Sequence, residues 1–391
     1  MAVRVEPRRE ATPLGAGALA IIRNLDLVLL VAVAGLVAYG LSVLSAVSRN
    51  DVPGDPDHYV VRQSVNVALG ALVFALATAV NPEAYRRVQK PLYLAALVGL
   101  SVVFVADQVR GTKRWIDIGF FQFQPSELGK ALLVVTLAAF LADRARRLDE
   151  WRTTLGAVGV AALPAFLVFL EPDFGTALIY GAILAAALFV AGTRWAHLAA
   201  LAVGAVMTAL LVLWVLPSAG VEILRDYQVE RLTGFLNPDR DPSGATYNVT
   251  QSITAVGSGG LDGRGVAGAT QTHLNYLPEH TTDFIFSALA EQRGFVGAAL
   301  LLLLYALVVW RGVKTIALAP SLLGAMIVAA AVFALVVQVF VNIGMTIGVA
   351  PVTGIPLPFV SYGGSSMIAS LALIGLIQAV HVRGRLAARD A

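Results

Sequence analysis

The stretch LVLLVAVAGLVAYGLSVLSAVS, from Leu27 to Ser48, contains no charged side chain. A helix needs about 20 apolar residues to cross the hydrocarbon core of a bilayer, because each residue adds about 1.5 Å along its axis. The stretch therefore predicts a transmembrane helix. Further runs with few or no charges follow at residues 63–81, 91–106, 125–142, 153–170, 174–192, 195–220, 284–310, 316–348 and 361–380. The sequence thus predicts an all-α polytopic membrane protein with about ten transmembrane helices.

The composition agrees with a membrane protein. Of the 391 residues, 58% are hydrophobic and 14% are charged, whereas a soluble domain averages about 25% charged residues. The absence of cysteine excludes disulfides and thiol chemistry, and the five histidines show no spacing typical of metal ligands. The net charge of +3 follows from the basic loops described next and does not indicate nucleic-acid binding.

Lys and Arg in the connections predict the orientation, because short cytoplasmic loops are enriched in them. A cytoplasmic N-terminus places these basic residues inside: Arg4, Arg8, Arg9, Arg23, Arg86, Arg87, Lys90, Arg144, Arg146, Arg147, Arg152, Arg194, Arg311, Lys314, Arg383, Arg385 and Arg389. An even number of helices then places both termini in the cytoplasm. The predicted organisation is a tail at 1–24, one membrane domain at 25–383 and a tail at 384–391. The first helix lacks the form of a signal peptide, so we expect it to be retained.

Two connections on the outer side are long. The first covers residues 107–124, and the second covers residues 221–282, between the seventh and eighth helices. Ordered loops of more than about 15 residues are usually functional or disordered. Aromatic and aliphatic residues are spread through the second loop, which favours a functional role over disorder.

Asp283 lies in NYLPEHTTDFIF, Asn275 to Phe286, where the second loop meets the eighth helix. An aspartate there can cap the helix, because its side chain accepts hydrogen bonds from first-turn amides and complements the helix dipole. It can also act as a general base at the boundary between membrane and water, where partial burial raises basicity. The two roles are compatible.

Other charged residues lie inside the predicted helices. Glu291 and Arg293 are in the eighth helix, and an ionisable group in a span is usually paired or functional. For Glu291 we weigh a buried ion pair with a Lys or Arg of a neighbouring helix against a functional role. Glu127 and Lys130 in the fourth helix are spaced i, i+3, which puts them side by side on one face, where they neutralise each other. This pair is either purely structural or a polar point near the substrate.

Basic residues also occur on the outer side, against the usual bias. Arg110, Lys113 and Arg114 lie in the first long loop, and Arg62 lies at the outer end of the second helix. Arg and Lys bind phosphate strongly, so an anionic ligand at the outer surface explains them. The alternative is that they extend to lipid headgroups.

Two glycine-containing stretches complete the unusual features. GSGGLDGRG, Gly257 to Gly265, permits tight turns and close backbone approach, but it lacks the strand and lysine of a phosphate-binding loop. GIPLPFVSYGGSS, Gly354 to Ser366, contains two prolines that forbid a regular helix. Because non-helical backbone at membrane depth must be buried in protein or line a cavity, this stretch is predicted to be re-entrant or cavity-lining.

Together these motifs resemble a known family. GTKRWIDIGFFQFQPSELGK, EPDFGTAL, YNVTQSITAVGSGGLDGRG, NYLPEHTTDFIF and GIPLPFVSYGGSS occur in the order and at the helix positions typical of the SEDS family, the RodA/FtsW group. The resemblance covers the chain from the first helix to the tenth. The stretch ATQTHLNY, Ala269 to Tyr276, is most similar to the RodA, or elongation, branch.

The resemblance implies a function. It implies a peptidoglycan glycosyltransferase that polymerises lipid II at the outer face of the bacterial cytoplasmic membrane during cell elongation. The implied partners are a class B penicillin-binding protein, which supplies transpeptidase activity, and other proteins of the elongation complex, with no nucleic acid. By resemblance, Asp283 matches the family's essential aspartate, Glu127 and Lys130 match its polar pair, and Arg114 matches a basic residue of the first long loop.

The sequence departs from the family pattern at two places. The family usually has His-Thr-Asp-Phe, whereas this chain has Thr281-Thr282-Asp283-Phe284, with His280 one place earlier. This indicates that histidine is not required for the chemistry of Asp283. The common Glu-Glu pair of the eighth helix is Glu291-Gln292 here, so no second glutamate is available at that position.

The implied reaction needs a base for the attacking hydroxyl and cations for the departing pyrophosphate. Asp283 is the candidate base, and Arg62, Lys113 and Arg114 or a divalent cation, Mg or Mn, are candidates for the second task. A flippase or transporter of the lipid-linked precursor is the alternative. Transport needs polar groups along the whole membrane depth, whereas the unusual motifs here, apart from Glu291 and Arg293, gather on the outer side. A scaffold that only recruits the transpeptidase is the third hypothesis, and in it Asp283 is dispensable.

Overall fold

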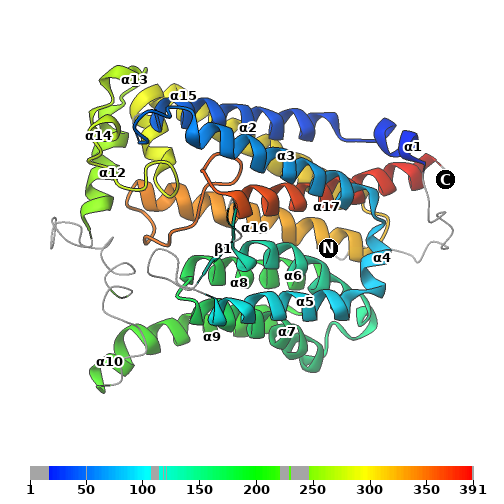
Figure 1. Cartoon of the computed structure of the whole chain (residues 1–391). Helices are drawn as coiled ribbons and strands as arrows, with labels where there is room; N and C mark the ends of the chain where they lie inside the picture. The colour runs from blue at the N-terminus through cyan, green and yellow to red at the C-terminus, as the bar shows by residue number, and fades with distance from the viewer. Residues whose placement is uncertain are drawn as a thin grey trace.

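A computed structural model describes residues 17–49, 51–106, 114–117, 119, 121–220, 229 and 246–389 (Figure 1). In this part of the chain, nine helices are long and apolar enough to span a membrane. They are α2 (Leu27–Val47), α3 (His58–Ala79), α6 (Pro125–Ala142), α7 (Trp151–Leu170), α8 (Phe174–Ala191), α9 (Trp195–Leu210, continued to Ser218 by a π turn and α10, Leu216–Ser218), α15 (Ile285–Leu318), α16 (Leu322–Thr346) and α17 (Gly364–Arg389). The shorter apolar helix α5 (Gln89–Val102), extended by a 3₁₀ turn to Val105, corresponds to the third predicted span.

The prediction of a polytopic helical membrane protein is therefore confirmed, and α6 has the predicted bounds. Pro125 begins α6, at the position where the missing N–H of proline costs no hydrogen bond. The predicted start of the ninth span at residue 316 was wrong, because α15 continues to Leu318. The chain leaves the helix at Ala319, and the side chain of Ser321 then accepts a hydrogen bond from the Gly324 amide and begins α16.

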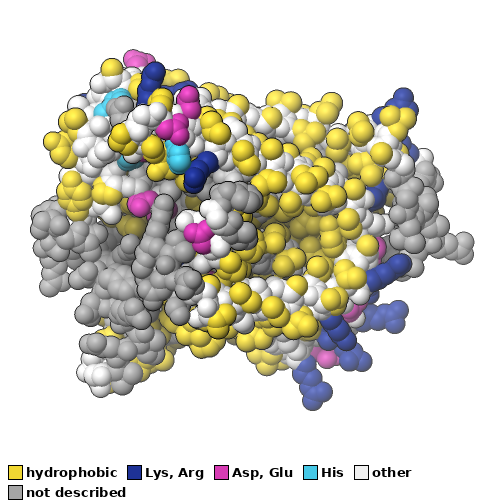
Figure 2. Space-filling view, viewed as in Figure 1, with side chains coloured by type: hydrophobic (Ala, Val, Ile, Leu, Met, Phe, Trp, Pro, Cys, Tyr) yellow, Lys and Arg dark blue, Asp and Glu magenta, His cyan; other side chains and the backbone are white. Residues whose placement is uncertain are grey.

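The described ends of the chain, which belong to the predicted tails, are helical. Residues 384–389 belong to the last helix, α17, and the short helix α1 (Ala18–Arg23) lies within the predicted N-terminal tail. α1, α4 (Pro82–Arg87) and the end of α17 lie together at one end of the bundle, on the right of Figure 1. We call this the basic end, because Lys and Arg side chains gather there on the face that Figure 2 shows.

The opposite end carries the connections that distinguish this fold. The part of the second long loop that the structure describes contains α12 (Tyr247–Ser258), α13 (Gly265–Gly268) and α14 (Thr270–His273), all on the left of Figure 1. In the first long loop, β1 (Ile116–Asp117) and β2 (Gln122–Phe123) form a short antiparallel hairpin. We call this end the loop end.

α15 is interrupted at Gly294, whose φ of 63° and ψ of −164° are not helical. The glycine-rich turn after α12 packs into this interruption. The amide of Phe295 donates to the carbonyl of Gly260 (2.9 Å), and the amide of Arg264 donates to the carbonyl of Glu291 (2.9 Å). A Cβ on Gly263 would overlap the carbonyl of Gln292. The stretch GSGGLDGRG thus provides the close backbone approach that the sequence predicts.

α17 lies in the core of the bundle, packs on α3, α16 and α6, and is almost completely buried. α9, by contrast, lies at the edge of the bundle (Figure 1) and buries only His197 along its own length. The central helices therefore form a rigid support for the segment that connects α16 to α17 at the loop end.

Candidate active site

Residues 351–363, between α16 and α17, form a non-helical segment that we call the linking segment. Ile355, Leu357, Phe359 and Val360 are buried, and side chains of neighbouring helices donate to three of its carbonyl groups. Gln338 donates to the Pro356 carbonyl (2.9 Å), Asn342 to the Ile355 carbonyl (2.7 Å) and Tyr305 to the Pro358 carbonyl (2.5 Å). Irregular backbone at membrane depth needs such partners. The predicted absence of a regular helix is confirmed for residues 354–363, whereas residues 364–366 already belong to α17. The re-entrant or cavity-lining role stays a prediction.

Asp283 lies beside the linking segment and is half-buried. Gly354 has a φ of +70°, and a Cβ built on it would lie 3.5 Å from Oδ2 of Asp283. The Nδ2 group of Asn342, which holds the segment, also donates to the Asp283 carbonyl (2.9 Å). A glycine at 354 thus combines the left-handed backbone with close approach to the carboxylate.

The residues before Asp283 are tied to the same segment. The amide of Tyr362 donates to the Thr281 carbonyl (2.9 Å), and the hydroxyl of Ser361 donates to the Thr282 carbonyl (2.5 Å). The capping interpretation of Asp283 was wrong. α15 begins at Ile285, its N-cap residue is Phe284, and no side chain caps it. Residues 278–284 form consecutive turns, in which the amide of Phe284 donates to the Glu279 carbonyl (3.1 Å), and the helix begins only after them.

The predicted pair of Glu127 and Lys130 is confirmed. Their side chains are each 1% exposed, and Nζ of Lys130 lies 2.8 Å from Oε2 of Glu127. Nζ also donates to Oε1 of Gln338 (3.1 Å), whose amide group holds the Pro356 carbonyl. A continuous set of contacts therefore runs from the ion pair in α6, through α16, to the linking segment beside Asp283.

Gln338 and Asn342 were not among the residues singled out in the sequence. They are isolated polar residues, four apart, in the otherwise apolar helix α16. Residues at i and i+4 share one helix face, and polar side chains in a span usually hydrogen-bond to other helices. This spacing was the available signal for both of them.

A second group of carboxylates lies where α7 ends and α8 begins, in the turn Glu171-Pro172-Asp173, which we call the acidic turn. Asp173 caps α8 by accepting from the Thr176 amide (3.1 Å), and it accepts from Nε2 of Gln124 (2.9 Å). Glu171 is 1% exposed, and its carboxylate oxygens accept no hydrogen bond from the described residues. Burial, reinforced by the charge of Asp173 and opposed by Arg114, raises the pKa of Glu171 to about 8, so this group carries a proton at neutral pH.

The acidic turn borders the linking segment from the other side. A Cβ on Gly175, in the first turn of α8, would overlap the Ile355 side chain and lie 2.9 Å from the Thr353 carbonyl. Residues 353–355 thus lie between the acidic turn and Asp283. EPDFGTAL contributed to the family resemblance, but its sequence alone does not reveal that Glu171 is buried without a hydrogen-bond partner.

The predicted cations do not all meet at Asp283. Arg114 donates through Nε to the Glu171 carbonyl (2.9 Å) and through a terminal nitrogen to the Pro172 carbonyl, so it holds the acidic turn. Arg62 is exposed on α3 at the loop end. Lys113 and Arg110 lie outside the described residues. Binding of pyrophosphate by Arg62, Lys113 and Arg114 therefore stays a prediction.

The described residues also do not provide a ligand set for the expected Mg or Mn ion. No three of their His, Asp or Glu side chains converge as metal ligands would. The divalent cation stays a prediction from the resemblance, and no catalytic step is assigned to it below.

The ion-pair interpretation of Glu291 was wrong. Its carboxylate is fully buried and accepts from the amide of Gln271 (2.8 Å) and from the amide (3.1 Å) and hydroxyl (2.6 Å) of Thr272. Glu291 thus fixes α14 and the loop end to α15. Arg293 donates instead to the Ser42 hydroxyl (3.0 Å) and lies over the ring of Tyr39.

His280, three residues before Asp283, contacts the connection between α2 and α3. Its Nε2 lies 3.3 Å from the Asp51 carboxylate, and its Nδ1 lies 2.9 Å from the Leu277 carbonyl. Burial lowers the pKa of His280, but the hydrogen bonds to Asp51 and Leu277 outweigh burial and raise it overall. His280 therefore links the loop to the connection between α2 and α3.

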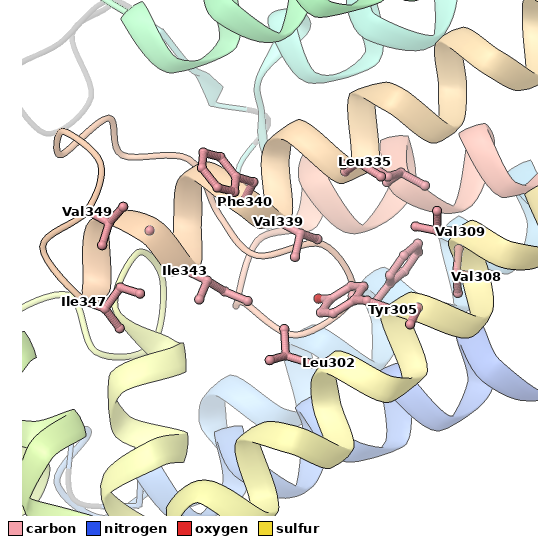
Figure 3. A pocket seen from close by; sticks show the side chains of 14 residues that line it. Leu302, Tyr305, Val308, Val309, Leu335, Val339, Phe340, Ile343, Ile347 and Val349 are labelled. Atoms are coloured by element: carbon pink, nitrogen blue, oxygen red, sulfur yellow. The ribbon is translucent and has the colours of Figure 1, made fainter.

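A pocket of about 320 Å³ opens between α15 and α16, where side chains of the two helices point toward each other (Figure 3). Its lining is apolar and includes Leu302, Tyr305, Val339 and Ile343. None of the charged candidate residues that the structure describes lines it. The polar groups of the candidate site therefore lie around Asp283 and not in this pocket.

Comparison with known proteins agrees with this architecture. The family model FTSW_RODA_SPOVE, described as cell cycle protein, matches residues 23–386. The peptidoglycan glycosyltransferase MrdB of Escherichia coli strain K12 is 34% identical over 372 residues, which are 94% of this chain and 96% of MrdB.

Two solved structures are similar along almost the whole chain. One is a chain of a peptidoglycan synthase complex that coordinates polymerization and crosslinking, with a TM-score of 0.77, 34% identity and coverage of 92% of this chain and 98% of that one. The other is the rod shape determining protein RodA of Thermus thermophilus, with a TM-score of 0.66, 32% identity and coverage of 91% and 96%. The chain is thus a multi-pass helical membrane protein that belongs to the FtsW/RodA/SpoVE family of cell cycle proteins.

Proposed function

We propose that this chain is a peptidoglycan glycosyltransferase that polymerises lipid II, with Asp283 as the general base. The observation that carries the proposal is the position of the Asp283 carboxylate. It is half-buried at the loop end, beside Gly354 of the linking segment. Hydrogen bonds that run from the Glu127–Lys130 pair through Gln338 to the Pro356 carbonyl support that segment. MrdB, which aligns along nearly the whole chain, is named for the same activity.

In the proposed reaction, Asp283 takes the proton from the 4-hydroxyl group of one lipid-linked disaccharide. The hydroxyl oxygen forms a bond to C1 of the second disaccharide, and the bond from C1 to the pyrophosphate oxygen breaks. The electron pair leaves with the polyprenyl pyrophosphate. Arg62, Lys113 and Arg114 are the proposed partners of the leaving group.

The loop end is proposed to face the outside of the bacterial cytoplasmic membrane. The supporting observation is that α1 and the end of α17 lie at the basic end, away from α12 to α14 (Figure 1), and basic loops are typical of the cytoplasmic side. Both termini are then cytoplasmic. The partner is proposed to be a class B penicillin-binding protein that crosslinks the product during elongation, as the similar synthase complex couples polymerization and crosslinking.

The test is polymerisation of purified lipid II by the chain with its transpeptidase partner. We expect Asp283→Asn to lower the rate by about 100-fold or more, because a general base contributes about 10² to 10⁴. Asp262→Asn is the matched control, since Asp262 is an exposed carboxylate of the same loop end, and it should keep the wild-type rate. A wild-type rate for Asp283→Asn would refute the assignment, and a wild-type protein that moves lipid II between leaflets without forming glycan would support the transporter alternative.

A further inference from the structure

A pocket of about 920 Å³ opens at the basic end, opposite Asp283. It lies where α5 begins, α6 ends and α7 begins. Four cationic side chains line it: Lys90 of α5 and Arg144, Arg146 and Arg147 of the connection between α6 and α7. The activity proposed above uses none of these residues.

The charge of this pocket is not neutralised by its own lining. Among the described residues, Asp143 is the one carboxylate that lines it, and this carboxylate accepts from Nε of Arg86 (2.5 Å) and Nε2 of Gln89 (2.7 Å). Arg144 is held in place by a hydrogen bond to the Phe140 carbonyl (3.1 Å) and by stacking over the Phe140 ring. Arg146 and Arg147 are exposed. The mouth of the pocket therefore presents several cations to an incoming anion.

The inner part of the pocket is different. Tyr93, Phe140 and Val160 supply apolar surface, and the Tyr93 hydroxyl is already bonded to the Val160 carbonyl (3.0 Å). Val160 lies nine residues inside α7, which at about 1.5 Å per residue is roughly 14 Å from the helix start. The pocket thus extends from a cationic mouth into the depth where lipid chains lie.

We propose that this pocket binds one anionic phospholipid of the adjoining leaflet. Its phosphate contacts Lys90, Arg144, Arg146 and Arg147, and one acyl chain lies against Tyr93, Phe140 and Val160. Basic pockets between helices are known to hold anionic headgroups. A free phosphate ion would use only the mouth, and the apolar wall at membrane depth favours a chain-bearing ligand over a soluble acidic peptide.

The experiment measures lipids retained by the purified full chain in neutral detergent, by native mass spectrometry, with phosphatidylglycerol or phosphatidylcholine added. We expect one tightly held phosphatidylglycerol and at least tenfold weaker retention of phosphatidylcholine. Arg146→Gln/Arg147→Gln should weaken phosphatidylglycerol retention about 30-fold, because each cation near an anionic surface contributes roughly fivefold. Both positions are exposed, so this variant should fold.

Two comparisons separate the pocket from general surface charge. Arg385→Gln/Arg389→Gln removes two exposed cations of the same end and should leave retention unchanged. Val160→Phe fills the apolar wall without changing charge and should also lower retention at least tenfold. Equal losses in the two arginine double variants, unchanged retention in Val160→Phe, or displacement of the lipid by millimolar inorganic phosphate would each overturn the proposal.

Discussion

Glu127 and Lys130 place a full pair of opposite charges inside the bundle, each side chain 1% exposed. Removing one partner leaves an uncompensated buried charge, which typically costs about 3–5 kcal/mol. We therefore expect Lys130→Met to lower the free energy of unfolding by this amount, measured by thermal or denaturant unfolding in detergent. Glu127→Gln/Lys130→Met removes both charges and should recover much of the loss. A double variant as unstable as the single one would contradict the ion-pair account.

Glu171 gives a prediction for the dependence of stability on pH. Its pKa is about 8 in the folded chain against a usual value of 4.5. The folded state therefore binds this proton more tightly than the unfolded state does. The contribution of Glu171 to the free energy of unfolding is complete below about pH 4.5. It is lost as the pH rises through 8, at up to about 1.4 kcal/mol per pH unit.

Glu171→Gln resembles the protonated group and cannot ionise. We expect its unfolding midpoint to fall less than that of the wild type between pH 6 and pH 9. Glu150→Gln, which alters an exposed carboxylate between α6 and α7, should follow the wild-type curve. If wild type and Glu171→Gln keep parallel curves, Glu171 does not carry the proton inferred for it.

Contacts within one helix could be predicted from the sequence of this site, whereas contacts between distant segments could not. The i, i+3 spacing of Glu127 and Lys130 was sufficient to predict their pairing, because both partners belong to one helix. The partners of Glu291 come from residues 271 and 272 of the second long loop, and no local pattern indicates that contact. Gln338 and Asn342 act on a segment that follows them by 13 to 18 residues, so their role depends on how the chain turns back.

At the scale of elements, the interruption of α15 depends on the glycine-rich turn. Gly263 has a φ of +82°, and any Cβ would overlap the backbone of Gln292. We expect Gly263→Ala to lower the free energy of unfolding by about 1–3 kcal/mol, through left-handed strain and loss of the close approach. The measurement is the unfolding midpoint in detergent.

Gly257 offers the matched control for this turn. It lies in α12, six residues earlier, and a Cβ there would meet nothing within 4 Å. Gly257→Ala should be neutral or stabilise by up to about 1 kcal/mol, since alanine favours helix over glycine. A Gly263→Ala protein as stable as Gly257→Ala would show that the turn does not need to approach α15.

The helices themselves were well predicted from hydropathy, because a span must be long and apolar whatever it packs against. Their ends were predicted less well. The apolar run at residues 316–318 continues α15, and the signals that separate α15 from α16 are Pro320 and the cap formed by Ser321, which a hydropathy average does not register. The non-helical path of the linking segment was predicted because its prolines exclude a helix, but its position beside Asp283 requires the tertiary fold.

At the scale of the whole molecule, the two ends differ in chemistry. The loop end carries Asp283, the acidic turn and α12 to α14, whereas the basic end carries α1, α4 and the end of α17 (Figure 1). The proposed function requires the loop end to face outward, because lipid II is polymerised there. The same arrangement puts the pocket lined by Lys90 and Arg144 in the cytoplasmic leaflet.

The chain contains no cysteine, so a single introduced thiol reports its own side of the membrane without background. Asp262→Cys places a thiol on an exposed position of the loop end, and Arg385→Cys places one on an exposed position of the basic end. In intact spheroplasts, a membrane-impermeant maleimide should label Asp262→Cys, and it should label Arg385→Cys only after permeabilisation. The reverse pattern would place Asp283 on the cytoplasmic side, where a glycan strand cannot be delivered to the wall, and would require the transport hypothesis instead.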